Sequence, residues 1–384
     1  MKKRLVALFL ASLLFSLVSN AVAQDEDQKI ITKFYGQLWF NTDYEVQDSN
    51  ASGMGHRDSD TTFGFDEAFT RFGVYIYYGK FTGQVEVRPV SGSPLRQWGG
   101  EYDFGGYKVF IGNAYTPIFI RSDLMGRNDM SYLQYMGVTP YIRRQMIQLT
   151  MPAGIGTLKV AAIKPVAKRV VDAKGTWVEG PPDVQVYATD TDITIPKIEA
   201  SYEIKSPVGD YYLSGGYLQT GETLKATNES YDIKSYYLGA CASNTFGPLT
   251  VKASGYLSQN GSEYDDEGAA LLSAVYNTSK DTIEDATGFG YHLAASYKIN
   301  ERYSIQGGYG SVHWEVANAT AGLPDNEEDN AMYYVNMPIR FGQKLSFTLT
   351  PEICFFDNKE KKAGNVITDQ GKKRYYGITS VIKF

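Results

Sequence analysis

Residues 81–88 read Phe-Thr-Gly-Gln-Val-Glu-Val-Arg, a stretch in which apolar or small residues alternate with polar ones. Successive side chains of a β-strand point to opposite faces, so this period of two predicts a strand with one apolar and one polar face. The same alternation recurs in residues 249–258 and 344–350 and dominates the chain from residue 33 to its end. The sequence therefore predicts an all-β protein.

The connections between the alternating segments fall into two length classes. Seven are tight turns, found at Gly79, Gly105-Gly106, 153–156, 207–209, Gly247-Pro248, Asn300-Glu301 and Gly342-Gln343. Eight are long and polar, found at about 44–66, 91–94, 116–140, 166–195, 220–231, 259–286, 316–329 and 357–372. Strict alternation of the two classes predicts sixteen strands and is typical of outer-membrane barrels, which have short periplasmic turns and long external loops. We therefore expect a 16-stranded antiparallel transmembrane β-barrel over residues 33–384.

Residues 268–277 are apolar enough to form a short helix or a further strand. We expect a loop element, because one added strand would place the two chain ends on opposite sides of the membrane. Aromatic girdles mark both interfaces of such barrels. Tyrosines near the strand ends are candidates for them, among them Tyr35, Tyr75, Tyr211 and Tyr297, although strand parity does not let all of them face lipid.

The two ends of the chain carry export signals. A basic start at residues 2–4, an apolar stretch at 5–18 and Ala21-Val22-Ala23 predict a cleaved signal peptide over residues 1–23. Residues 24–32 would then be a short periplasmic segment before the barrel. One face of the last strand is formed by Tyr376, Ile378, Ile382 and Phe384. This pattern resembles the C-terminal signal that the barrel-assembly machinery of bacterial outer membranes reads, so we expect that location for the protein.

Composition excludes several other classes. After residue 24 the 384-residue chain has no uncharged apolar run near the roughly 20 residues that a membrane helix needs. A formal net charge of −6 does not fit nucleic-acid binding, which needs a basic surface. Two cysteines, Cys241 and Cys354, do not form a disulfide framework, and their pairing stays open.

A barrel of 16 to 18 strands is too wide for side chains to fill, and it encloses an aqueous channel. We therefore expect passive diffusion of small hydrophilic solutes and ions through the lumen. Residues 116–140 form the third long connection and are expected to fold inward as the constriction loop.

The strand before that loop, residues 107–117, reads YKVFIGNAYTP. It resembles a motif of the porin superfamily that includes the phosphate-selective porins O and P, and Gly112, Thr116 and Pro117 match. Tyr115 stands where that family often has Lys, and no acidic residue follows Pro117 before Asp123. The resemblance implies a water-filled porin, commonly a homotrimer in contact with lipopolysaccharide, but these departures leave phosphate specificity open.

Charged residues around the loop predict the selectivity of the constriction. The candidates are Arg71, Glu86, Arg88, Lys108, Arg121, Asp123, Arg127, Asp129 and Arg144. Charges that line a pore set its ion preference, and the excess of basic residues favours weak anion selectivity. The alternative is that several of them lie on external loops or form structural ion pairs.

The sequence offers little support for catalysis. The histidines, His56, His292 and His313, are not accompanied by a Gly-x-Ser-x-Gly motif. We predict no catalytic residues, metal or cofactor, because the acidic clusters lack the spacing of a calcium loop. Two alternatives to a general porin remain: a substrate-specific channel for phosphate, a sugar or an organic acid, and a structural or adhesive barrel that does not conduct.

Overall fold

The computed structural model describes residues 29–48, 58–66, 69–89, 95–119, 142–165, 189–193, 195–224, 229–264, 274–277, 282–316, 326–342, 346–363, 366–369 and 371–384. Its strands are β1 Ile31–Gln47, β2 Asp58–Phe65, β3 Arg71–Tyr78, β4 Phe81–Val87, β5 Leu95–Asp103, β6 Lys108–Tyr115, β7 Arg143–Ala153, β8 Gly156–Ile163, β9 Thr189–Ile193, β10 Lys197–Ser206, β11 Gly209–Leu224, β12 Ser230–Phe246, β13 Leu249–Gln259, β14 Val275–Asn277, β15 Thr282–Glu284, β16 Ala286–Lys298, β17 Ser304–Val316, β18 Asn326–Asn336, β19 Ile339–Phe341, β20 Ser346–Ala363, β21 Val366–Asp369 and β22 Lys372–Lys383. A short 3-10 helix, η1, spans Gly261–Tyr264. No helix in these ranges is long and apolar enough to cross a membrane.

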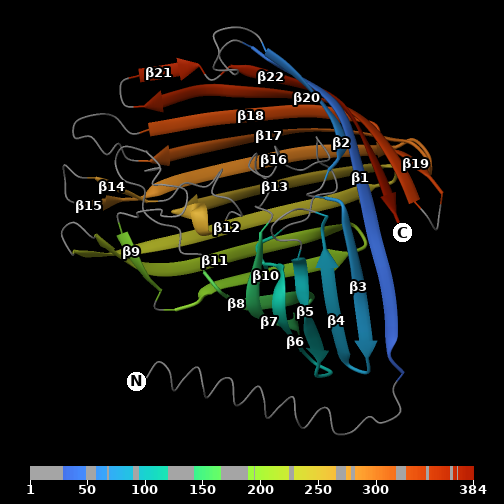
Figure 1. The fold of residues 1–384 in the computed structure, drawn as a ribbon, viewed down its shortest axis with the longest axis horizontal. Coiled ribbons are helices and arrows are strands. Elements are labelled where there is room, and N and C mark those ends of the chain that lie inside the picture. The colour runs from blue at the N-terminus through green and yellow to red at the C-terminus, as the bar shows by residue number, and fades with distance from the viewer. Residues whose placement is uncertain are drawn as a thin grey trace.

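All of these strands except β14 and β15 form one antiparallel sheet that closes on itself (Figure 1). β1 pairs with β22 over eleven registered positions, from Gln37 opposite Lys383 to Gln47 opposite Lys373. Four places in the ring are each occupied by two shorter strands that follow one another in the chain. These pairs are β2 and β3, β9 and β10, β18 and β19, and β21 and β22. Counted this way the barrel has sixteen strands, as the alternation of turn lengths predicted.

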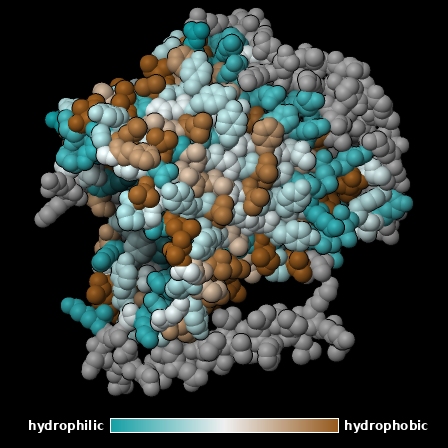
Figure 2. All heavy atoms as spheres, turned by 180° about the vertical axis from the view of Figure 1, so that it is seen from behind, coloured by the Kyte–Doolittle hydropathy of each residue, from teal (hydrophilic) through white to brown (hydrophobic). Residues whose placement is uncertain are grey.

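The two faces of the wall separate apolar from polar side chains. On neighbouring strands β11, β12, β13 and β16, the outward residues Leu213, Leu238, Leu257 and Leu293 are each more than half exposed. The inward residues of these strands, such as Ser214 and Ser258, are buried. Figure 2 shows apolar residues across the outer wall, with hydrophilic residues most abundant toward its ends. Such a wall satisfies every internal backbone group within the sheet, which a bilayer requires.

The tight turns have the backbone geometry that their sequences predict. Gly79, Gly154 and Gly247 have φ angles of 55°, 58° and 60°. This left-handed conformation has no steric cost for glycine. It lets the chain reverse within two residues between β3 and β4, β7 and β8, and β12 and β13.

The structure corrects several predicted boundaries. β1 starts at Ile31 rather than 33, and β2 starts at Asp58, inside the expected loop 44–66. Residues 58–62 at the start of β2 are all polar, which hides this strand end from a search for apolar alternation. Of the ambiguous segment 268–277, Val275–Asn277 forms β14, which pairs only with β15 in a separate hairpin. The barrel count is therefore unaffected, as expected for a loop element. The predicted signal peptide lies outside the described residues.

Of these four tyrosines, two lie on the outer wall and two point into the barrel. Tyr211 and Tyr297 are 37% and 49% exposed on the outer wall. Tyr35 and Tyr75 instead point into the barrel, where their rings stack with centroids 4.9 Å apart. Tyr35 and Tyr75 are therefore among the tyrosines that do not face lipid, and the reason is that Tyr35 shares its face with the buried residues Gln37 and Asn41.

Candidate channel constriction

The described part of loop 116–140 turns into the barrel. The Phe119 amide donates to the Thr116 carbonyl at 3.0 Å, which closes a tight turn at the start of the loop. The Thr116 amide donates to the Ile142 carbonyl at 3.2 Å and joins the two ends of the loop. Thr116, Ile118 and Ile142 are all buried.

The segment reaches the inner wall several strands away from β6. The Ile118 amide donates to Oε2 of Glu199 on β10 at 3.4 Å. The Tyr212 hydroxyl on β11 donates to the Pro117 carbonyl. Since β7 and β8 lie between β6 and β10 in the sheet, residues 116–119 run inward across the lumen face. The predicted inward fold is thus seen for its first four residues.

Of the three motif residues, Gly112 has the clearest structural reason. It lies opposite Gly99 of β5, and a Cβ atom on Gly112 would collide with the Trp98 carbonyl oxygen and approach the Gly99 Cα atom. Glycine at this position lets two strands come unusually close just before the loop. Thr116 and Pro117 begin the inward turn.

A carboxylate bound by several donors lies on the inner wall beside this loop. Glu86 is 2% exposed, and its Oε1 atom lies 3.0 Å from Arg96 Nε and accepts from Gln97 Nε2, also at 3.0 Å. Its Oε2 atom accepts from the Tyr35 hydroxyl at 3.0 Å and lies 3.6 Å from Arg71 Nε. Burial of a carboxylate is costly unless it is paired and hydrogen-bonded, and both conditions are met here.

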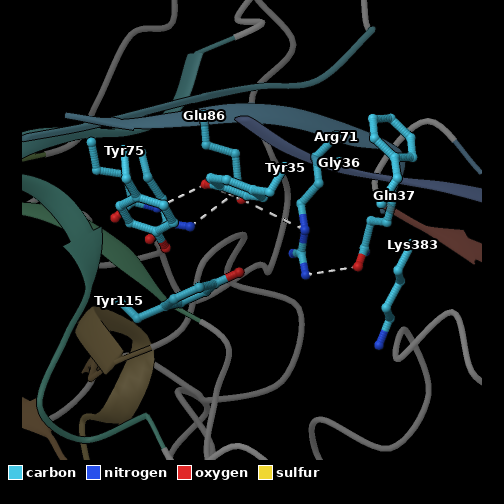
Figure 3. Close-up of a pocket in the computed structure, with 11 residues that line it drawn as sticks. Tyr35, Gly36, Gln37, Arg71, Tyr75, Glu86, Tyr115 and Lys383 are labelled. Atoms are coloured by element: carbon cyan, nitrogen blue, oxygen red, sulfur yellow. Dashed lines mark hydrogen bonds and ion pairs between the residues drawn. The ribbon is translucent and has the colours of Figure 1, made fainter. Parts of the chain in front are cut away.

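This cluster borders a cavity of about 380 Å³ (Figure 3). Its walls come from both ends of the chain and from the first strands, because β22 closes against β1. The lining residues are Tyr35, Gly36, Gln37, Arg71, Tyr75, Gln84, Glu86, Gln97, Tyr115, Lys383 and Phe384. The cavity therefore combines a compensated carboxylate, basic groups, amides and phenol rings.

The other predicted charges have different positions. Arg88 lies directly after β4 and is half-buried. Arg144 is half-buried on the face of β7 that also carries the buried residues Met146 and Gln148. Lys108 lies beside a short turn, is exposed, and pairs with Glu101 at 3.1 Å. Arg121, Asp123, Arg127 and Asp129 lie outside the described residues.

Sequence reasoning missed Arg96, the basic residue that lies closer to Glu86 than Arg71 does. The pairing of β4 with β5 shifts register between Glu86 and Val87. This bulge turns both Arg96 and Gln97 inward, although alternation would place them on opposite faces. Lys383 was not predicted as a site residue, because only barrel closure brings it beside Gln37.

The inner wall of the C-terminal half carries both apolar and polar buried side chains, the polar ones including Lys252, Asn330 and Glu352. Buried side chains there form one contact cluster with Ile118 and Ile142 of the loop ends, namely Tyr237, Tyr256, Tyr264, Val312, Trp314, Met332, Tyr334, Cys354, Phe356 and Tyr375. Both cysteines are free and buried. His292, also buried, stacks on Tyr334. Among the described residues, no three His, Cys, Asp or Glu side chains gather into a metal-binding group.

The last strand presents the face that its sequence predicted. Tyr376, Ile378 and Phe384 are 40%, 42% and 52% exposed on the outer wall, and Ile382 is half-buried on the same face. Phe384 also exchanges two backbone hydrogen bonds with Gly36, of 2.9 and 3.1 Å. The final residue therefore belongs to the seam that closes the barrel.

Comparison with known proteins supports this architecture. No protein-family model matches the sequence, and no curated protein matches it. Among solved structures, the outer membrane channel DcaP of Acinetobacter baumannii is similar at a TM-score of 0.66 and 13% identity, over 92% of this chain and 97% of that one. An anion-selective porin from Comamonas acidovorans has a TM-score of 0.58 at 13% identity, over 93% and 100%. The trimer form of OmpT, an outer membrane protein of Vibrio cholerae, has a TM-score of 0.57 at 14% identity, over 92% and 99%.

The fold is that of outer-membrane porins. Identities this low establish the fold and not the solute. The resemblance to the phosphate-selective porins is not among these likenesses and stays a prediction.

Proposed function

We propose that the protein is an outer-membrane porin whose water-filled channel passes small hydrophilic solutes and ions by passive diffusion, with a weak preference for anions. The observation that carries the proposal is the closed sixteen-stranded ring with a polar, charged cluster on its inner wall. A ring of this size leaves room for water, and passive diffusion needs no energy-coupling domain.

The anion preference is supported by the charges around the cavity. Arg71 and Arg96 pair with one carboxylate, Glu86, and Lys383 lines the same cavity, so the local balance is basic although the whole chain is acidic. Arg88 and Arg144 add positive charge beside this region, and the four charged loop residues from Arg121 to Asp129 belong to the same proposal. Lys108 has the weakest support, because Glu101 offsets its charge.

The test is the reversal potential of the purified full chain in a planar bilayer under a KCl gradient. We expect a potential of the sign that chloride selectivity produces, and R88Q and R144Q should each move it toward zero. The control is R302Q, because Arg302 is exposed in a short turn. A cation-selective sign would refute the anion preference, and absence of any conductance would refute the channel.

A substrate-specific channel is the second candidate, and the stacked tyrosines Tyr35 and Tyr75 in the cavity favour it. Aromatic rings beside hydrogen-bonding amides bind sugars or organic acids better than they bind bare ions. Millimolar phosphate, glucose or succinate should then block the KCl current in a concentration-dependent way. A general porin would show no such block.

Export through the signal peptide, insertion by the barrel-assembly machinery, contact with lipopolysaccharide and assembly as a homotrimer belong to the same proposal. The OmpT structure is of a trimer form, which is consistent with that assembly. Analytical ultracentrifugation in detergent tests it, with a mass three times that of the chain expected.

A further inference from the structure

We propose that a buried ion pair on the inner wall, Lys197 with Glu199, is a latch that holds residues 116–119 inside the lumen and so limits the bore of the channel. The inference rests on the proposed porin function and assigns positioning roles to Lys197, Glu199 and Tyr212.

The pair itself is unusual for a barrel wall. Lys197 Nζ lies 2.9 Å from Glu199 Oε1, and both side chains are fully buried. The two residues are separated by one position on β10, so they point to the same, inward face. A buried ion pair contributes little stability compared with apolar side chains of similar volume. Its presence therefore points to a role in fixing a specific arrangement.

The pair is connected to the loop through Glu199. The second oxygen of its carboxylate, Oε2, accepts the Ile118 amide at 3.4 Å. Tyr212, on the next strand, donates its hydroxyl to the adjacent Pro117 carbonyl. One acceptor and one donor on the wall thus bind the N–H and the C=O of the single Pro117–Ile118 peptide group, which fixes both its position and its orientation.

Lys197 links the ion pair to a second external loop, the one that contains η1. Its ammonium group lies 4.8 Å from the ring centroid of Tyr264, the last residue of η1. The Tyr264 hydroxyl donates to the Ser235 carbonyl at 3.2 Å, so the ring is tied to β12. A cation over an aromatic ring is stabilised further when water is excluded. The latch therefore joins two inward segments to one point of the wall.

The sequence leaves space for this junction at Gly216. This residue lies opposite Glu199 in the pairing of β10 with β11. A Cβ atom on Gly216 would come within 2.5 Å of the Tyr264 ring and 3.2 Å of the Glu199 side chain. Any larger residue would displace the ring or the carboxylate.

Single-channel recording of the purified full chain in planar bilayers tests the latch. E199Q removes the charge and Y212F removes the loop bond with little change of shape. Each should raise the conductance about twofold by widening the constriction, and should admit larger polyethylene glycols. The matched controls are E203Q and K205M, because Glu203 and Lys205 form a 3.2 Å pair on the same strand with the same spacing, but with side chains 29% and 71% exposed instead of fully buried. These controls should conduct like the wild type.

A thiol-labelling measurement keeps the test independent of conduction. In a C241S/C354S background, the cysteine of I118C is buried and should react slowly with a maleimide. Adding E199Q should raise its labelling rate about tenfold, the effect of losing one hydrogen bond to a charged group. Folding is checked by the electrophoretic shift between unheated and heated samples. If E199Q fails to fold, the conductance and the labelling rate of the Y212F variant test the latch instead.

The outcomes separate the two proposals. A wild type that does not conduct, together with faster labelling in E199Q or Y212F, refutes the porin function and retains the latch. A wild type that conducts, with folded E199Q and Y212F unchanged in conductance and labelling rate, refutes the latch and retains the porin.

Discussion

Replacing Glu86 with glutamine tests whether the cluster around this carboxylate borders the solute path. E86Q keeps the size of the side chain and removes its charge. Arg96 and Arg71, 3.0 and 3.6 Å away, then lose their anionic partner. The inner wall becomes more positive by one unit, so we expect stronger anion selectivity.

The size of the effect follows from Coulomb's law. An ion passing about 6 Å from the altered charge in water gains or loses about 0.7 kcal/mol. At about 0.1 M salt the Debye length of about 10 Å reduces this to about 0.4 kcal/mol. Because the anion gains what the cation loses, the anion-to-cation permeability ratio should rise about fourfold. Stability should fall by about 3 to 5 kcal/mol, the cost of breaking a buried ion pair.

Reversal potentials under a KCl gradient and urea unfolding in detergent measure the two quantities. The matched control is E101Q, which removes the carboxylate of an exposed pair with Lys108 and should cost less than about 1 kcal/mol. A folded E86Q channel with the reversal potential of the wild type would refute the reasoning. It would show that the cluster is a structural ion pair away from the solute path.

Three further predictions concern the wall. G112A should destabilise the barrel by about 1 to 3 kcal/mol in urea unfolding because the added methyl group meets the neighbouring strand, whereas G64A, where a Cβ atom has open space, should leave stability unchanged. L238R should cost about 2 to 4 kcal/mol in refolding into lipid vesicles, as a charge on the lipid face does, and L238V should cost far less. Cys241 and Cys354 are free and buried, so a maleimide polymer should add to neither in the folded protein and to both after denaturation, as a shift on a gel. Labelling of only one or of neither thiol in the denatured protein under non-reducing conditions would contradict this.

The barrel could be predicted because its determinants are local. A strand needs a period of two, and a tight turn needs a residue such as Gly79 or Gly154 that adopts positive φ at no cost. Both signals can be read within ten residues of sequence. The start of β2 could not be predicted, because residues 58–62 are all polar and outside the bilayer neither face of a strand has to be apolar.

The site was only partly predictable because it depends on non-local geometry. Alternation placed Glu86 on the inner wall correctly, and its partner Arg71 as well. Arg96 depends on a bulge, which shifts the register by one residue and leaves no clear sign in the sequence. Tyr35 depends on which face of β1 turns inward, and its position at a strand end fits an interface equally well.

The distribution of side chains inside the barrel narrows the path that a solute can take. Ile118 and Ile142, at the two ends of the constriction loop, pack in the same cluster as the aromatic residues of the C-terminal half. Apolar side chains buried in that contact offer no hydrogen bonds to a hydrated ion, and opening the contact would expose them to water. The opposite wall carries the polar cavity around Arg71 and Glu86. Substitutions of Arg71 or Glu86 should therefore change selectivity more than substitutions within the buried cluster of Ile118 and Ile142.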